Sequence, residues 1–472
     1  MRLLDVARGA YARSPAVVRR SLAPLISLVP TRMKFGGAYR QWREMIDRGH
    51  ADPGYARERH LAALRGLLVQ AHARSPFYRR LIEAAFGPLF DPASVTPEQL
   101  QRLPVLRKAD LAAAGDDVLI APKAQLDEGY TSGSNGERPF GFYLDKDRSV
   151  REFAFVNHVW GRAGYAEGEP RAVLRGFRLP TFFGKVYEWE PALRELRISV
   201  FPMTADDASL YVDLIDKHHI RYLYGYPSAI EVMCRHLLRL GRKPHLPLKG
   251  ILPISEPLFP HQRRLFRQVF GNAVVVPFYG LSEKAIFAVE VPGQPDVYEF
   301  EPLYGCAELV DEQGEPVAAI GTEGRLVGTG FISTGMPFIR YDTEDRATLV
   351  APATSGNGYR LRVQAITPRR KPGFLIGADG TRVVTTDFTP EQPVFFAGID
   401  EYQFYQEEPG KCTIKYVSGA SGTREDVERV RGALEFKAEG KIAFNLQEVE
   451  SLISGTNGKR AFIDQRLDLS RY

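Results

Sequence analysis

A segment rich in glycine and hydroxyl side chains, at residues 130–142, has a composition that could bind a phosphate. Its glycines allow the backbone to bend and approach a ligand closely, while its hydroxyls and backbone N–H groups can donate to an anion. The residues concerned are Thr131, Ser132, Gly133, Ser134 and Gly136. The segment does not end in the Lys-Ser/Thr pair of the P-loop. Taken alone, such a segment is more often an ordinary turn.

Two further segments combine aromatic rings with carboxylates. Residues 279–283, Tyr-Gly-Leu-Ser-Glu, follow a β-branched run, and a strand end is a rigid place from which to hold a ligand. Tyr279 could stack on a base and Glu283 could hold Mg²⁺ beside phosphates, with a capping acid at a turn as the alternative. At 337–345, Asp345 could accept hydrogen bonds from ribose hydroxyls, although a surface turn with scattered acids is commoner.

The composition indicates an ordinary globular protein with more than one domain. The chain has 472 residues, of which 44% are hydrophobic and 25% charged. A net charge of +5 is small for this length, and the sequence has no long run of Lys and Arg. Neither feature indicates a nucleic-acid partner. The cysteines, Cys234, Cys306 and Cys412, lie far apart and lack metal-ligand spacing, which suits a reducing compartment.

The first forty residues form a basic arm that contains eight Arg or Lys residues and a single acid, Asp5. Its apolar run at 22–29 is too short to span a bilayer, and it lacks the small-residue cleavage site of a secretory signal. A packed arm is one interpretation, and a surface helix that contacts anionic lipid is the other. We expect a cytoplasmic protein, with peripheral contact at the inner membrane face in the second case.

Helical and strand-like segments alternate in the middle of the chain, which is typical of α/β layering. The pattern predicts helices at 209–219, 229–240 and 261–270 and strands at 222–224, 250–254 and 273–278. Strands and turns dominate from 306 to 350. Prolines bracket a basic stretch at 367–373, which indicates a hinge. We therefore expect an α/β protein with a large domain at 1–366 and a small α+β domain at 374–472.

Taken in order, these segments resemble the adenylate-forming ligases, most closely the phenylacetate-CoA ligase family and its capsular polysaccharide biosynthesis branch. The resemblance covers nearly the whole chain. The family's TSG[ST]TGxP loop is matched at 131–139, except that Asn135 replaces the second threonine. Its Gly-Ser/Ala-Glu-Pro-Leu motif is matched at 255–258, with Ile254 in place of the glycine. The Gly-Tyr-Pro-Ser, Tyr-Gly-x-Ser-Glu and Ile-Arg-Tyr-x-Thr-x-Asp motifs are matched at 225–228, 279–283 and 339–345. Gly458-Lys459 resembles the family's terminal glycine-lysine segment. Residues 160–164 and 174–176 resemble the capsule branch in particular.

The resemblance implies a two-step reaction: ATP and a carboxylic acid give an acyl-adenylate and pyrophosphate, and a nucleophile then displaces AMP. Because forming the mixed anhydride brings negative groups together, donors, Mg²⁺ and a lysine must offset that charge. By resemblance the 131–136 loop binds the β- and γ-phosphates, Glu283 binds Mg²⁺, Asp345 binds the ribose, and Lys459 reaches in from a mobile small domain. The other residues implied in ATP binding are Ser255, Glu256, Pro257, Tyr279, Gly280 and Ser282, with Arg370 at the hinge.

Several departures from the family pattern leave alternatives open. Glu137-Arg138 replaces the usual lysine position of the phosphate loop, Glu344 stands where glycine is usual, and Pro372 could stiffen the hinge. The acceptor is coenzyme A, or else an amine or sugar hydroxyl of a cell-surface polysaccharide precursor. A non-catalytic nucleotide-binding homologue is the alternative of a different class. The carboxylic acid itself is not identified by the sequence.

Overall fold

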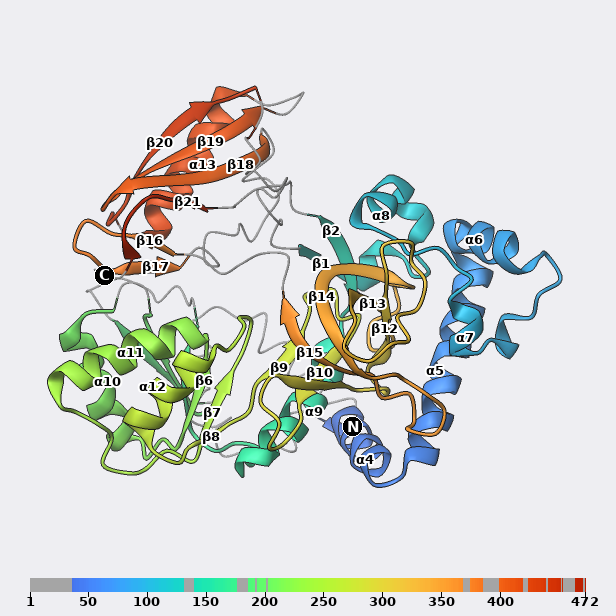
Figure 1. Cartoon of the computed structure of the whole chain (residues 1–472), viewed down its shortest axis with the longest axis horizontal. Coiled ribbons are helices and arrows are strands. Elements are labelled where there is room, and N and C mark those ends of the chain that lie inside the picture. The colour runs from blue at the N-terminus through green and yellow to red at the C-terminus, as the bar shows by residue number, and fades with distance from the viewer. Residues whose placement is uncertain are drawn as a thin grey trace. The chain divides into compact units, whose positions relative to one another are not determined.

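The computed structural model describes residues 36–130, 140–175, 186–191, 193–200, 203–367, 374–384, 399–418, 423–438, 440–450, 452, 463–469 and 472. The chain divides into two compact units (Figure 1). The first unit comprises Met1–Asp127, Leu144–Ser199 and Thr204–Ile366, and the second comprises Glu128–Tyr143, Val200–Met203 and Thr367–Tyr472. The predicted hinge at 367–373 stays a prediction, because residues 368–373 lie outside the described residues.

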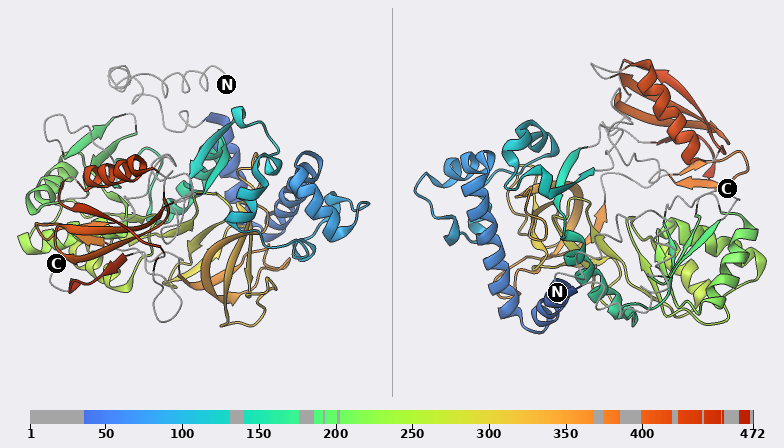
Figure 2. Two further views of the ribbon diagram at one scale, coloured as in Figure 1. Left: turned by 90° about the horizontal axis from the view of Figure 1, so that it is seen from above. Right: turned by 180° about the vertical axis from the view of Figure 1, so that it is seen from behind.

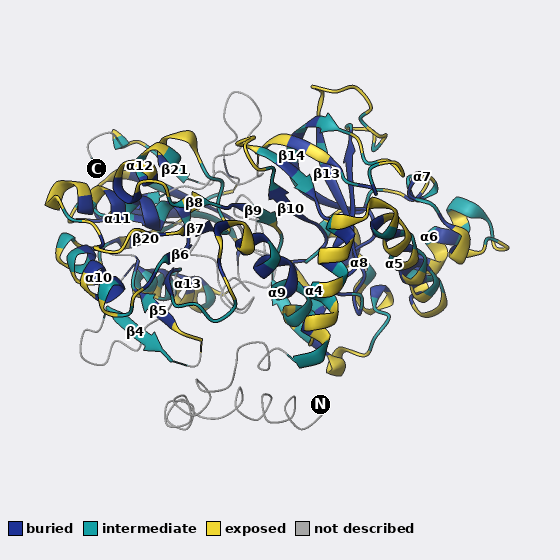
Figure 3. Cartoon of the chain, turned by 90° about the horizontal axis from the view of Figure 1, so that it is seen from below, coloured by how far each residue is buried: buried dark blue, intermediate teal, exposed yellow. Residues whose placement is uncertain are grey.

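Helices precede the sheets in the first unit. They are α4 (Gly36–Ala51), α5 (Pro53–Arg74), α6 (Pro76–Phe86), α7 (Pro97–Leu100) and α8 (Lys108–Ala114), with short 3₁₀ turns at Pro92–Ser94, Gly115–Val118 and Lys123–Gln125. Asp52 and Ser75 cap α5 and α6, each just before a proline at the first helical position. Both α4 and α5 have an exposed and a buried face (Figure 3). None of the described helices is long and apolar enough to cross a membrane.

The first unit contains a six-stranded sheet with flanking helices. Its order is β4 (Tyr187–Glu190), β5 (Glu195–Ile198), β3 (Arg171–Leu174), β6 (Tyr222–Gly225), β7 (Gly250–Pro253) and β8 (Val274–Val275). The helices are α9 (Arg148–Trp160), followed by a 3₁₀ turn at Gly161–Ala163, α10 (Ala205–Lys217), α11 (Pro227–Leu240) and α12 (Pro260–Phe270). Only β4 runs antiparallel to its neighbour, and β3, β6 and β7 are buried throughout, as expected of parallel strands. The predicted α/β alternation is confirmed.

A seven-stranded sheet completes the first unit; its strands are drawn in yellow to gold in Figure 2. Its order is β12 (Gly305–Val310), β13 (Glu323–Gly330), β14 (Tyr341–Ala351), β15 (Arg362–Thr367), β11 (Val297–Phe300), β10 (Phe287–Glu290) and β9 (Phe278–Gly280). The single strand expected at 273–278 is wrong. Pro277, which cannot donate to a ladder, separates β8 from β9, and the two belong to different sheets.

The C-terminal part of the second unit is a small α+β structure. A four-stranded sheet has the order β20 (Ala443–Glu448), β19 (Lys411–Ser418), β18 (Ile399–Glu408) and β21 (Ile463–Gln465), and α13 (Arg424–Lys437) packs against it. Two strand pairs accompany it: β16 (Phe374–Ile376) with β17 (Arg382–Val384), and β1 (Leu126–Tyr130) with β2 (Gly141–Asp145). The buried Gln406 side chain bonds both backbone groups of Ile376, which ties β16 to β18.

We predict that Gly225→Ala lowers the free energy of unfolding by about 2 kcal/mol or more. An added Cβ at Gly225, the last residue of β6, would lie 2.1 Å from the carbonyl oxygen of Leu174 on β3. Urea denaturation followed by circular dichroism measures the effect. The matched control is Gly66→Ala in α5, where nothing lies within 4 Å and the change should stabilise by up to about 1 kcal/mol. Equal stability of the two variants would contradict the close approach of β3 and β6.

Candidate functional site

The parallel strands of the six-stranded sheet, β5, β3, β6, β7 and β8, end at one edge, which we call the strand-end edge. The residues that follow β3, β6, β7 and β8 there are Arg175, Tyr226, Ile254 and Val276. In open α/β sheets ligands bind outside the carboxyl ends of the strands. The predicted nucleotide residues Ser255, Glu256 and Pro257 come directly after β7 and therefore lie at this edge.

The Ser255-Glu256 pair joins β7 to the start of α11. Ser255 is exposed and has φ of 66°, a left-handed conformation that is strained for a serine. The Glu256 carboxylate accepts hydrogen bonds from the backbone N–H of Ser228 at 3.0 Å and from its hydroxyl at 2.9 Å. A carboxylate at a helix N-terminus satisfies unpaired N–H groups and complements the helix dipole. Glu256 therefore has a structural role, in addition to the nucleotide contact predicted for it.

The other two predicted motifs are joined by a crossed pair of hydrogen bonds. Tyr279 Oη donates to Asp345 Oδ2 at 2.6 Å, and Tyr341 Oη donates to Glu283 Oε1 at 2.7 Å. Tyr279 lies on β9 and Asp345 on β14, and three strands separate β9 from β14 in the sheet order. The sheet must therefore curl for these two side chains to meet. Both carboxylates are buried, so neither belongs to the surface turn that was the commoner alternative.

Burial keeps both phenols protonated. It raises the pKa of Tyr279 well above its usual value, and the negative charge of Asp345 raises it further. Burial raises the pKa of Tyr341 in the same way, with Glu283 as the neighbouring charge. A phenol that keeps its proton is a donor, and an ionised carboxylate only accepts. The two hydrogen bonds therefore hold the carboxylates in fixed orientations at neutral pH.

A β-bulge in β14 directs Asp345 toward Tyr279. Val327 pairs with Asp342 and Arg325 pairs with Arg346, so the three residues 343–345 lie opposite Leu326 alone. Thr343 Oγ1 donates to the Leu326 carbonyl at 2.8 Å and accepts from Asp345 N–H at 3.2 Å. Bulges of this kind re-aim side chains and are common beside active sites.

The bulge gives position 344 a conformation that favours glycine, the residue that is usual there in the family that the sequence resembles. Glu344 has φ of 65°, a conformation that glycine adopts without cost. Its side chain instead forms an ion pair with Lys108, whose Nζ lies 2.6 Å from Glu344 Oε2. Each side chain is about one-fifth exposed, so the pair is only partly screened by solvent. Glutamate at this position therefore lacks the conformational freedom of glycine, but it gains an ion pair with Lys108 of α8.

Arg340 is a site-supporting residue that the sequence analysis did not single out. Its side chain is buried and forms an ion pair with Glu308, with Nη2 3.1 Å from Oε1. The guanidinium also donates to the carbonyls of Gln101, Leu103 and Gly314. These contacts fix the residue before Tyr341. A sequence signal did exist, because Glu308 is the one acid in the otherwise apolar strand 305–310.

The residues that could hold Mg²⁺ are few. Within the described ranges, no group of three or more His, Cys, Asp or Glu side chains is placed to bind a metal ion. Mg²⁺ at nucleotide sites is commonly held by one or two carboxylates together with substrate phosphates. Glu283 fits that donor set, because Tyr341 orients one of its oxygens and the phosphates would complete the coordination. It does not form a cage for the ion by itself.

The remaining predicted residues divide into two groups. Gly280 and Ser282 are exposed, next to Tyr279 and Glu283. The phosphate loop, the hinge arginine and the terminal lysine lie outside the described residues, so their roles stay predictions; they are Thr131, Ser132, Gly133, Ser134, Gly136, Arg370 and Lys459.

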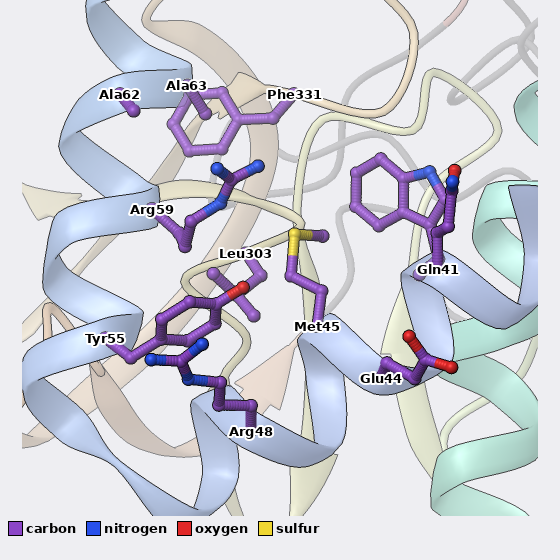
Figure 4. A pocket seen from close by; sticks show the side chains of 11 residues that line it. Gln41, Glu44, Met45, Arg48, Tyr55, Arg59, Ala62, Ala63, Leu303 and Phe331 are labelled. Atoms are coloured by element: carbon purple, nitrogen blue, oxygen red, sulfur yellow. The ribbon is translucent and has the colours of Figure 1, made fainter.

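A separate cavity of about 780 Å³ lies between α4 and α5 (Figure 4). Its lining includes Trp42, Met45, Arg48, Tyr55 and Arg59, and the Arg48 guanidinium lies 4.1 Å from the centre of the Tyr55 ring. None of the predicted site residues lines it. The strand-end edge and the crossed pair, rather than this cavity, therefore form the candidate site.

We predict that Glu344→Gly unfolds at a higher urea concentration than Glu344→Ala. Both variants lose the ion pair with Lys108, and only glycine relieves the left-handed backbone, which costs an alanine about 1 kcal/mol. Urea denaturation compares the two proteins directly. An alanine variant as stable as the glycine variant would contradict the left-handed bulge.

Comparison with known proteins identifies the fold. No protein-family model matches the chain, and no curated protein matches it in sequence. A crystal structure of 2-hydroxyisobutyryl-CoA ligase in the postadenylation state, in complex with R3-HIB-AMP, matches with a TM-score of 0.50 and 19% identity, covering 86% of this chain and 88% of that chain. A structure of the same ligase with 2-HIB-AMP and CoA in the thioesterification state gives 0.52 and 18%, with 87% and 90% covered. The chain is thus a mixed α/β protein with the fold of this acyl-CoA ligase.

Proposed function

We propose that this chain is a ligase that uses ATP to activate a carboxylic acid as an acyl-adenylate, releasing pyrophosphate, and then transfers the acyl group. The observation that carries the proposal is the crossed pair of hydrogen bonds, Tyr279 to Asp345 and Tyr341 to Glu283. It brings together two motifs that the sequence assigns independently to one nucleotide. The fold shared with an acyl-CoA ligase supports the same activity.

The chemistry of the site follows from its fixed carboxylates. Asp345, held by Tyr279, would accept hydrogen bonds from ribose hydroxyls. Glu283, held by Tyr341, would bind Mg²⁺, an ion that offsets phosphate charge when bound. A preorganised acceptor needs no reorganisation when the ligand arrives. In this proposal the 131–136 loop binds the β- and γ-phosphates, and Lys459 offsets the charge between the carboxylate and the α-phosphate.

A non-catalytic homologue is the less favoured candidate. A carboxylate that is buried without a ligand is costly, and a protein that no longer binds nucleotide would be free to lose it. This chain keeps Glu283 and Asp345 buried, each with a tyrosine donor. The retained pair therefore favours an active nucleotide site.

The acceptor and the branch of the family belong to the proposal as well. Coenzyme A is the acceptor that we favour, because the solved ligase with this fold is in complex with CoA. Residues 160–164 and 174–176 resemble the capsule branch, which favours an amine or sugar hydroxyl of a polysaccharide precursor instead. In either case we propose a cytoplasmic protein whose basic arm contacts the inner membrane face.

The test is ATP–pyrophosphate exchange with a panel of aromatic, fatty and amino acids. We expect exchange with at least one acid, and we expect Glu283→Gln and Lys459→Ala to lower it by about 100-fold or more, since the first removes a carboxylate that would hold Mg²⁺ and the second removes a positive charge beside the phosphates. Glu315→Gln and Lys411→Ala, which change the same charges at exposed positions, are the matched controls.

Two outcomes would count against the proposal. A folded wild-type protein that exchanges with no acid of the panel is not an adenylate-forming enzyme. Exchange that is unchanged in Lys459→Ala would remove the role assigned to that lysine. Mass spectrometry of the product, with and without coenzyme A, then identifies the acceptor.

A further inference from the structure

Two arginines lie on the same face of β3, where side chains alternate between the two faces of the sheet. Arg171 begins the strand and Arg175 follows its last residue, four positions later. Both pack against Tyr224 of the neighbouring β6, with their guanidinium carbons 5.6 and 5.5 Å from the ring centre. The two positions therefore offer a comparison between similar surroundings.

The charge of Arg171 is balanced within the protein. Its Nη2 lies 2.6 Å from Glu195 Oε1, and its Nη1 donates to the Tyr165 hydroxyl. Both members of the ion pair are buried. A buried guanidinium with a carboxylate partner is the expected arrangement for a structural arginine.

Arg175 forms no such ion pair among the described residues, and Glu195, the carboxylate whose charge raises the Arg175 pKa, acts on it only from beyond ion-pair distance. Its Nη1 donates to Tyr224 Oη at 3.0 Å, and the Tyr226 phenol is a second neutral neighbour. Across the described ranges, no carboxylate lies within ion-pair distance of Arg175.

Arg175 lies where ligands bind in other open α/β sheets. Arg175 is only partly exposed and sits at the strand-end edge, beside Tyr226 at the end of β6. A partly desolvated charge without a counter-charge costs free energy. A guanidinium has five N–H donors in a planar fork, and two phenols cannot use them all. A planar carboxylate from a ligand would supply both the missing charge and the missing acceptors.

We propose that Arg175 binds a second carboxylate on the acid substrate, so that the substrate class of this enzyme is dicarboxylic acids. The proposal rests on the proposed ligase function. One carboxylate of the substrate is activated by ATP, and the other pairs with the Arg175 guanidinium, which Tyr224 holds in place. Arg175 is thereby the residue that selects a dicarboxylic acid over a monocarboxylic acid of the same length.

The experiment measures ATP–pyrophosphate exchange, without coenzyme A, for matched acids: glutarate against valerate, adipate against hexanoate, and phthalate against benzoate. We expect wild-type protein to have the larger kcat/KM for at least one diacid of these pairs. Arg175→Gln, which keeps donors for the phenols and removes the charge, should lower that preference by about tenfold or more. Arg239→Gln, at an exposed position of α11, should leave it unchanged.

A stability measurement separates ligand binding from a structural role. Without ligand, Arg171→Gln should lower the melting temperature because it leaves Glu195 buried without its main partner. Arg175→Gln should lower it much less, since no carboxylate loses a partner. Glutarate should raise the melting temperature of the wild-type protein more than that of Arg175→Gln. This last measurement does not depend on turnover.

Several results would overturn the inference. Wild-type preference for the monoacid in every pair, or an unchanged preference in Arg175→Gln, would leave the ligase function in place and remove the diacid specificity. A higher KM for coenzyme A in Arg175→Gln, with exchange unaltered, would assign the arginine to the phosphates of coenzyme A. A fall in melting temperature as large as that of Arg171→Gln would make Arg175 structural. Failure of all exchange would instead contradict the proposed function.

Discussion

Two hydrogen bonds from the phenols of Tyr279 and Tyr341 to buried carboxylates are the constraint on which the candidate site depends. They connect β14 with β9 and with the residues that follow β9; since β9 and β14 are not neighbours in the seven-stranded sheet, the contacts exist only because the sheet curls. Each carboxylate would be costly to bury alone, and each phenol would leave an unpaired hydroxyl. Together they satisfy one another and still present acidic groups of fixed orientation. The bulge that contains Glu344 positions Asp345, and the ion pair of Arg340 with Glu308 fixes the residue before Tyr341.

The parallel sheet contributes the other half of the site. Its strands end together, and the close approach of β3 and β6 at Gly225 brings Arg175 beside Tyr224. The Glu256 carboxylate accepts hydrogen bonds at the start of α11, while Arg175 has no carboxylate within ion-pair distance among the described residues. At the strand-end edge, Glu256 therefore has a structural role, whereas Arg175 is suited to bind an anionic ligand.

Much of the architecture could be predicted from the sequence, because long periodic segments with clear caps specify their own structure. The alternation from β6 to α12 and the final α+β region are examples. Local patterns could not reveal that the strands on either side of Pro277 belong to different sheets, or that Tyr279 contacts Asp345. Both features depend on the order of the strands in the sheets. Nor could they show that Glu256 caps α11 or that Arg340 is buried. Motif order identified the site residues, and tertiary packing determined which of them touch.

The most direct test of the central claim compares the binding of ATP and 2′-deoxy-ATP to wild-type protein and to Asp345→Ala by calorimetry. If the crossed pair orients Asp345 toward ribose, the wild-type protein binds ATP about tenfold more tightly than 2′-deoxy-ATP, since a hydrogen bond to a charged group is worth about 1.5 kcal/mol or more. Asp345→Ala then binds both nucleotides with the same, weaker affinity. Equal discrimination in the two proteins would contradict the account.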